Sequence, residues 1–158
     1  MLDGEMRGLL ESGCSLIVGL LTASGAPFAT RGWGLDVIDA RGGTARLLTG
    51  AGDLGRVGRT WGDLAGSPIA VTGADVRTFH SVQVKGTVER VEAVTPGDEE
   101  RAERYTDLFF EAVGEVDFTP PEVLERFRPV DLVALVLHLV EAYDQTPGPG
   151  AGARLGRT

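Results

Sequence analysis

A glycine-rich turn over residues 49–56, Thr-Gly-Ala-Gly-Asp-Leu-Gly-Arg, has the residue types that bind an anion. It precedes residues 54–65, where apolar side chains recur at helical spacing with Asp53 as a natural N-cap, so its backbone amides would open a helix. Free amides and the helix dipole attract phosphate at such a position. Arg56 would add charge-assisted hydrogen bonds, as would Arg59, unless both side chains simply face water. The turn therefore predicts an anion site.

A second candidate segment is the alternating stretch that follows His80. Polar side chains that form hydrogen bonds occupy every second position, and valines occupy most of the others, which is typical of a half-buried strand in a barrel or antiparallel sheet. The polar donors would suit the pyrimidine edge of a flavin, although an exposed sheet face shows the same pattern. The polar side comprises Ser81, Gln83, Lys85, Thr87 and Glu89.

Arg31 is the third candidate, because it lies in a predicted strand just before Gly32, Trp33 and Gly34. Glycine inside a strand often marks the close approach of a ligand or of another backbone. Arg31 would reach a phosphate there, or it would pair with a surface acid. Trp33 would cover a planar ring, or it would belong to the core, as most tryptophans do.

Other chemistries find less support in the sequence. Residues 50–55 match G-x-G-x-x-G, with Asp75 at the distance of a ribose-binding acid, so a Rossmann-type dinucleotide site stays an alternative. A single crossover among hairpin-like pairs argues against it. No Ser-His-Asp set is apparent, and one cysteine with two histidines makes a structural metal site improbable.

Composition fits one ordinary globular domain of 158 residues, with 42% apolar and 24% charged residues. The net charge of −8 argues against a nucleic-acid-binding surface. The sequence has no apolar run of membrane-spanning length and no leader-like start, so we expect no membrane partner and a cytoplasmic location. The sole cysteine, Cys14, excludes an intrachain disulfide.

The patterns predict helices over 2–12 and 54–65 and two more that begin at Thr95 and Thr119. Predicted strands cover 15–22, 28–37, 44–49, 69–72, 78–91 and 130–143, and the last, apolar on both faces, would be central and covered. Residues 1–144 are then one domain. Residues 145–158 would be an extended tail that reaches a partner subunit, since 145–152 are rich in glycine and proline.

The order of these segments resembles the pyridoxamine 5′-phosphate oxidase-like family over roughly residues 12–92. The resemblance rests on residues 29–32, 47–50, 69–71 and 81–89, and the last of these, Ser-Val-Gln-Val-Lys-Gly-Thr-Val-Glu, is the most distinctive. It implies a mainly β fold with peripheral helices, a six-stranded and mostly antiparallel split β-barrel. It also implies a homodimer with FMN at the subunit interface.

The resemblance further implies where the cofactor would lie. Arg31 and the segment after Thr49, including Arg56, would hold the phosphate, and the ring would lie near Gly32, Trp33, Thr49 and Gly50. Ser81 and Gln83 would contact its polar edge. The oxidases themselves carry an Arg-Lys pair after the Thr49 position, which residues 53–56 lack, so we do not expect oxidation of pyridoxamine phosphate.

The sequence thus predicts a flavin-dependent oxidoreductase of unknown substrate, with a nicotinamide as electron donor. Relatives that bind a deazaflavin coenzyme or haem make those the alternative cofactors. The rival function is a non-catalytic binding or sensor module on the same barrel, with His80 as the axial ligand if the cofactor is haem.

Overall fold

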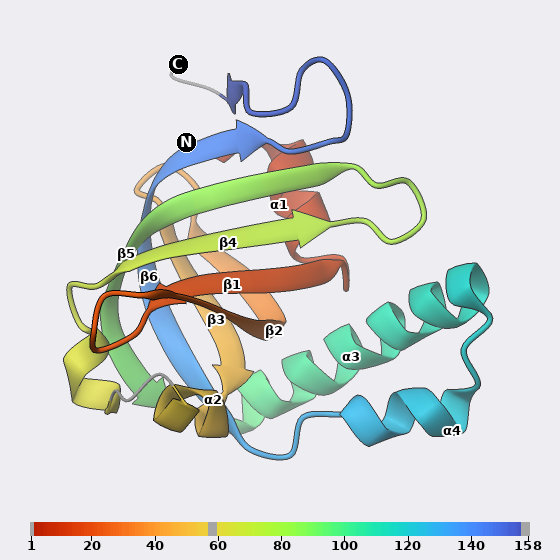
Figure 1. Ribbon diagram of the computed structural model, residues 1–158, viewed down its shortest axis with the longest axis horizontal. Helices are drawn as coiled ribbons and strands as arrows, with labels where there is room; N and C mark the ends of the chain where they lie inside the picture. The colour runs from red at the N-terminus through yellow and green to blue at the C-terminus, as the bar shows by residue number, and fades with distance from the viewer. Residues whose placement is uncertain (1, 57–59, 156–158) are drawn as a thin grey trace.

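A computed structural model of the protein describes residues 2–56 and 60–155, apart from the side chains at positions 53, 54, 56, 61 and 62. Figure 1 shows a strongly curved sheet with a long helix and a short one along one side. The strands are β1 (Ser15–Leu21), β2 (Pro27–Asp39), β3 (Thr44–Gly50), β4 (Pro68–Ala74), β5 (Ser81–Ala93), β6 (Leu132–Asp144) and β7 (Arg154–Leu155). The helices are α1 (Gly4–Leu10), α2 (Ala51–Arg56), α3 (Pro96–Asp117) and α4 (Pro121–Leu124), with 3₁₀ turns η1 (Trp61–Leu64) and η2 (Glu125–Phe127).

The described strands form a closed barrel. Their order is β3-β2-β1-β4-β5-β6, with β7 added to β6, and a further pairing of β3 with β6 closes the ring. Every pairing within the described residues is antiparallel. The predicted six-stranded antiparallel barrel is therefore confirmed. The Rossmann alternative is wrong, because that fold needs parallel strands joined by crossover helices.

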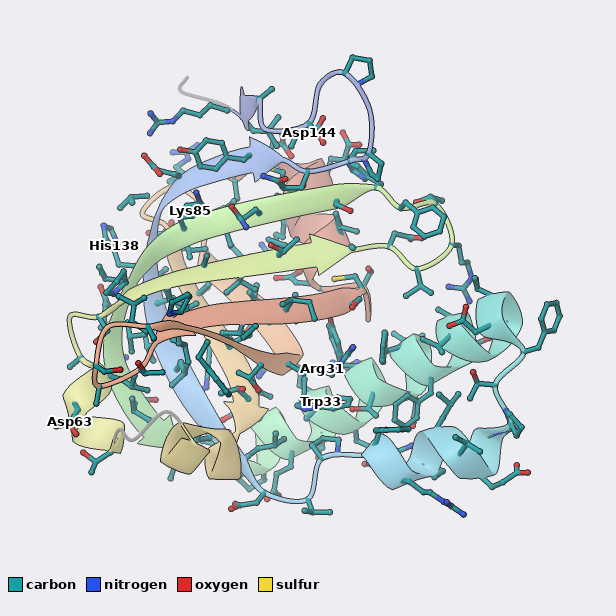
Figure 2. All side chains as sticks on the ribbon, viewed as in Figure 1. Arg31, Trp33, Asp63, Lys85, His138 and Asp144 are labelled. Carbon is teal, nitrogen blue, oxygen red and sulfur yellow. The ribbon has the colours of Figure 1, made fainter. Side chains whose placement is uncertain are left out.

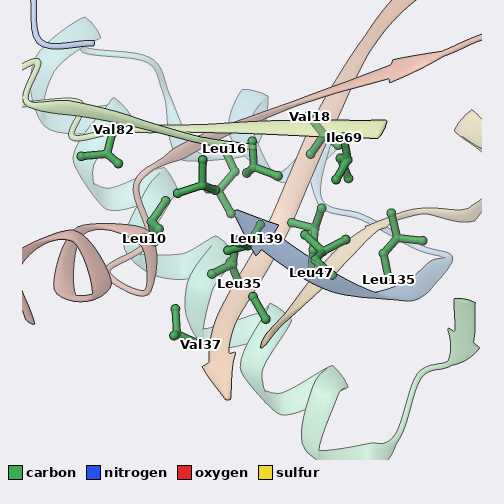
Figure 3. Packing of buried hydrophobic residues seen from close by; sticks show 14 of the residues in the cluster. Leu10, Leu16, Val18, Leu35, Val37, Leu47, Ile69, Val82, Leu135 and Leu139 are labelled. Carbon is green, nitrogen blue, oxygen red and sulfur yellow. The ribbon is translucent and has the colours of Figure 1, made fainter. Parts of the chain in front are cut away.

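The core fills the barrel with the inward side chains of alternate strand positions (Figure 3). Gly32 belongs to this interior, because a Cβ built on it would lie 2.9 Å from the Cβ of Leu16. Gly86 sits at a register shift between β5 and β6, where a Cβ would overlap the carbonyl oxygen of His138. Both glycines allow two strands to pack closely within the barrel wall.

The helix α3 begins as predicted and covers part of the outside of the barrel. Thr95 is its N-cap, with a capping box to Asp98 and a proline in the first turn. Ala102 packs with Leu48 of β3 and Ala134 of β6. This contact buries the outer face of β6 near its start, whereas His138 further along is exposed. The prediction of a central strand covered on both faces is thus correct for the first half of β6.

The predicted helix over 54–65 is wrong. The chain forms α2 from Ala51, with Asp53 inside it rather than at the cap, and Thr60 is extended. A second capping box explains the restart, because Thr60 and Asp63 exchange hydrogen bonds at the head of η1. Three glycines in the predicted helix gave it little intrinsic stability to oppose this break.

Two further starts differ from the prediction. The strand expected from Thr78 begins at Ser81, because Asp75 accepts hydrogen bonds from the amides of Arg77 and Thr78 and holds residues 75–80 in a turn. The helix expected to be capped by Thr119 begins only at Pro121, since the preceding Pro120 is extended, as residues before proline usually are.

The chain after β6 returns to the barrel instead of leaving it. Residues 145–153 contain turns and bends, and Arg154 and Leu155 then pair with Tyr143 and Ala142 as β7. The absence of regular structure predicted for residues 145–152 is confirmed. No described helix is long and apolar enough to cross a membrane.

Candidate functional site

Four neighbouring strands, β2, β1, β4 and β5, present an outer face that α3 borders at its β2 end. In Figure 1 β1, β4 and β5 cross the front of the barrel without a helix drawn over them. Strand register places two rows of side chains across this face. The first row is Arg31, Ile17, Thr72 and Gln83, and the second row is Ala29, Gly19, Ala70 and Lys85.

We call these eight positions the outer face. They carry two cations and no acid, although the chain has 23 acidic residues and a net charge of −8. A hollow of about 520 Å³ lies over the second row. The outer face is therefore apolar at this hollow and locally positive on an otherwise acidic protein, and this combination favours an anionic partner.

Arg31 projects from β2 toward α3, beside Trp33 (Figure 2). Its guanidinium carbon lies 4.6 Å from the ring centre of Phe109 and 5.7 Å from that of Trp33. Within the described residues it makes no ion pair with an acid. Partial burial lowers the pKa of Arg31, but an arginine stays charged at neutral pH. The result is a half-buried cation, positioned by aromatic rings and available to an anion.

Trp33 supports Arg31 rather than offering its own ring to a ligand. Its side chain is 8% exposed and makes edge contacts with Phe109 and Phe110 of α3, at 6.4 and 6.3 Å between ring centres. Neighbouring Gly32 faces the barrel interior. These two positions therefore place the backbone and the stacking partner of Arg31.

Thr49 and Gly50 lie at the end of β3, where their groups are used within the chain. The Thr49 side chain is fully buried and its hydroxyl donates to the carbonyl oxygen of Arg31 at 2.9 Å. Gly50 pairs with Leu132 in the ladder between β3 and β6. This arrangement fixes the ends of β2 and β3 against each other.

The predicted anion site at the start of α2 is partly occupied by the protein itself. The first amide of the helix, at Ala51, donates to the carbonyl oxygen of Asp131 at 3.1 Å. The side chain of Arg56 and the whole of Arg59 lie outside the described residues. What the structure describes of this turn is a helix of six residues with its first donor engaged.

Ser81 and Gln83 follow one another on β5 with different roles. Ser81 is 7% exposed, and its hydroxyl donates to the carbonyl oxygen of Phe79 at 2.8 Å. Gln83 lies on the outer face, where its amide nitrogen donates to the hydroxyl of Thr72 at 3.0 Å. His80 lies in the loop before β5 and outside the outer face. Of the predicted site residues described here, Arg31 and Gln83 share one row.

Comparison with known proteins identifies the fold. No family model matches the chain, and no curated protein matches it in sequence. The crystal structure of HupZ from Group A Streptococcus superposes with a TM-score of 0.55 at 15% identity, over 96% of this chain and 100% of HupZ. An F420 reductase superposes with a TM-score of 0.53 at 16% identity, over 90% of this chain and 98% of the reductase. The protein shares their split-barrel fold.

The resemblance to the pyridoxamine 5′-phosphate oxidase-like proteins is thereby confirmed at the level of the fold. A pyridoxamine 5′-phosphate oxidase-related, FMN-binding protein from Nostoc punctiforme is also similar, with a TM-score of 0.44 at 11% identity. That match covers 87% of this chain and 77% of the Nostoc protein.

The split barrel adds five residues to the outer face that the sequence did not single out for binding, namely Ile17, Gly19, Ala29, Ala70 and Thr72. They lie on β1, β2 and β4, which carry the two rows across the sheet. Their signal in the sequence was only that they fall in the predicted strands 15–22, 28–37 and 69–72. No group of three or more histidine, cysteine, aspartate or glutamate side chains suited to a metal occurs in the described residues.

Proposed function

We propose that the protein binds FMN on the outer face and acts as a flavin-dependent oxidoreductase. The observation that carries this proposal is the half-buried guanidinium of Arg31, which has aromatic neighbours and no acid within the described residues. A phosphate group would supply the missing negative charge and accept paired hydrogen bonds from the guanidinium.

The dimensions of the first row suit a long, flat ligand. Three strand gaps separate Arg31 from Gln83, which corresponds to roughly 14 Å at the usual strand spacing. Arg31 would hold the phosphate end, and the amide of Gln83 would form hydrogen bonds with the polar edge of the ring. Ile17 and Thr72 between them would contact the face of the ligand.

Bound FMN would supply the two-electron redox chemistry. The protein groups would hold and orient it: Arg31 through charge, Gln83 through its amide, and the apolar positions by excluding water from one face. The split barrel shared with an F420 reductase makes a deazaflavin coenzyme the alternative cofactor, since it too combines a planar ring with phosphate.

The test is a titration of the purified protein with FMN and with riboflavin, followed by flavin fluorescence. We expect FMN to bind at least tenfold more tightly, because riboflavin lacks the phosphate that would pair with Arg31. Oxidation of NADH or NADPH by the loaded protein would support the oxidoreductase assignment. Equal affinities for the two flavins, or a Soret band in place of flavin bands, would contradict the proposal.

The proposal includes a second copy of the chain. An uncovered face with an apolar hollow and the exposed Ile17, in a barrel of 16.7 kDa, is a surface that packing of an identical subunit would bury. The second copy would also shield the outward side of the ring from water.

A further inference from the structure

The residues that line the hollow over the second row are more apolar than the residues of the first row. Its floor and walls are almost entirely apolar, and Lys85 is the only charged residue that lines it. The volume of about 520 Å³ falls within the range of small-molecule sites. The floor is formed by Gly19, Ala29 and Ala70.

Gly19 has no internal reason to be glycine. A Cβ built on it would lie 3.7 Å from the carbonyl oxygen and 3.8 Å from the Cβ of Ala70, which are ordinary contacts. Its backbone is also free of the left-handed conformation that favours glycine. Glycine weakens a strand interior, so its presence here points to close approach from outside the barrel.

Lys85 is the single lysine of the chain. Its ammonium nitrogen lies 4.7 Å from the ring centre of Tyr143, and within the described residues it makes no ion pair. Its strand partner Glu141 is instead bound by Arg154 and by the hydroxyl of Tyr143. Lys85 thus lines the hollow and carries a charge that no acid of the described residues pairs with.

We propose that this hollow binds a small apolar molecule that carries one carboxylate, with Lys85 paired to the carboxylate and the apolar part on the floor at Gly19 and Ala70. The second row lies about 7 Å from the first along the strands. The ligand would therefore lie beside the cofactor as its substrate, and only this substrate role rests on the proposed function.

The experiment uses octanoate, octanol and octylammonium as probes of one shape and three charges. Each is titrated into the isotopically labelled protein without added flavin, and amide shifts are followed by NMR. We expect octanoate to bind about tenfold more tightly than octanol, and octylammonium more weakly than either, with shifts centred on Gly19, Ala70 and Lys85. Octanol binding as tightly as octanoate, or shifts centred elsewhere, would overturn the proposal.

Variants distinguish the contribution of the Lys85 charge from that of the apolar floor at Gly19. K85A should lower octanoate affinity about tenfold and leave octanol unchanged, whereas K85R should keep most of the octanoate affinity. G19V should abolish binding of both probes without loss of thermal stability, because valine suits a strand and its Cβ would make only ordinary contacts. R90A is the matched control, since Arg90 is a cation of the same strand that pairs with Glu92. An equal loss in R90A and K85A would contradict the assignment.

Three outcomes distinguish the other possibilities. If octanoate causes no shifts and G19V instead changes the sedimented mass, a second copy fills the hollow and the proposal is wrong. If octanoate binds as expected and FMN does not, the cofactor proposal fails and this site stands. If FMN binds and octanoate does not, this site alone is lost.

Discussion

Arg31 differs from several other arginines of the chain in the kind of group that contacts its guanidinium. Arg46, Arg77 and Arg128 are each fixed by carboxylates, whereas Arg31 is fixed by the rings of Phe109 and Trp33. Stacking orients a guanidinium without neutralising it. A side chain held in this way keeps its hydrogen-bond donors for a ligand.

The variant R31A should weaken FMN by roughly tenfold to a hundredfold and riboflavin by less than threefold, because only FMN has the phosphate. R31K should recover part of the FMN affinity, since it keeps the charge but loses the paired donors. Fluorescence titration measures both. R104A serves as control, as Arg104 is an exposed arginine of α3. Equal losses for the two flavins would refute the role of Arg31.

Two strand glycines, Gly86 and Gly19, should respond differently to replacement by alanine, because Gly86 packs against β6 whereas Gly19 faces the hollow. G86A should lower the free energy of unfolding by about 3 kcal/mol or more, because the new Cβ would overlap the backbone of β6. G19A should raise it by about 0.5 kcal/mol, through the reduced entropy of the unfolded chain. Urea unfolding of both variants gives the comparison. A destabilised G19A would show that Gly19 serves the barrel itself.

At the scale of elements, an ion-pair network attaches α3 to the barrel. Arg46 of β3 binds both carboxylate oxygens of Asp98 at 2.9 and 2.8 Å and also contacts Glu92 of β5. Arg101 links the same Asp98 to Asp36 of β2. Since Phe109 and Phe110 of α3 position Trp33 and Arg31, this network also supports the outer face.

The Arg46 guanidinium holds the pKa of Asp98 well below its usual value. The folded pKa is lower than the unfolded one, so this stabilisation is complete above about pH 5 and is lost as the pH falls below it. D98N should lower the free energy of unfolding by about 2 kcal/mol at pH 7 and by less at pH 3. Denaturant unfolding at several pH values measures this. E115Q should change the pH profile much less, because Arg77 also lowers the pKa of Glu115 but both side chains of this pair are exposed and screened by solvent. A D98N effect that does not depend on pH would contradict the charge argument.

The elements were predictable where local signals were strong. The predicted bounds of β3 agree with the structure to within one residue, and Thr95 with Pro96 marked the start of α3. The prediction of a helix over 54–65 was wrong because a capping box at Thr60 begins a new turn of helix. The prediction of a strand from Thr78 was wrong there because hydrogen bonds to Asp75 hold this part of the loop in a turn. In both cases a side chain that binds nearby backbone decided against the apolar pattern.

The outer face was predictable only in its separate parts. Arg31 and Gln83 each gave a sequence signal, but their common row depends on strand register through Ile17 and Thr72. Long-range register is set by the closing of the barrel, which periodicity does not encode. Likewise, the Thr49 hydroxyl donates to the carbonyl oxygen of Arg31, which lies 18 positions earlier and which only the fold brings near.

For the whole molecule, the prediction that remains to be measured is the homodimer. Sedimentation equilibrium should give twice the chain mass of 16.7 kDa. I17E should shift the mass toward one chain, because Ile17, 41% exposed, lies at the centre of the outer face. I38E is the control, since Ile38 is 58% exposed near the far end of β2. Dissociation by I38E and not by I17E would place the interface elsewhere.

The position of Lys85 makes it a natural reporter. Because the chain has no other lysine, a reagent that acylates amines has one side-chain target, and that target belongs to a residue that lines the hollow. Trypsin does not cleave after an acylated lysine, so the modified protein would yield a longer peptide that contains Lys85. The amount of this peptide, measured by mass spectrometry, would then show whether the hollow of the unmutated protein was filled when the reagent was added.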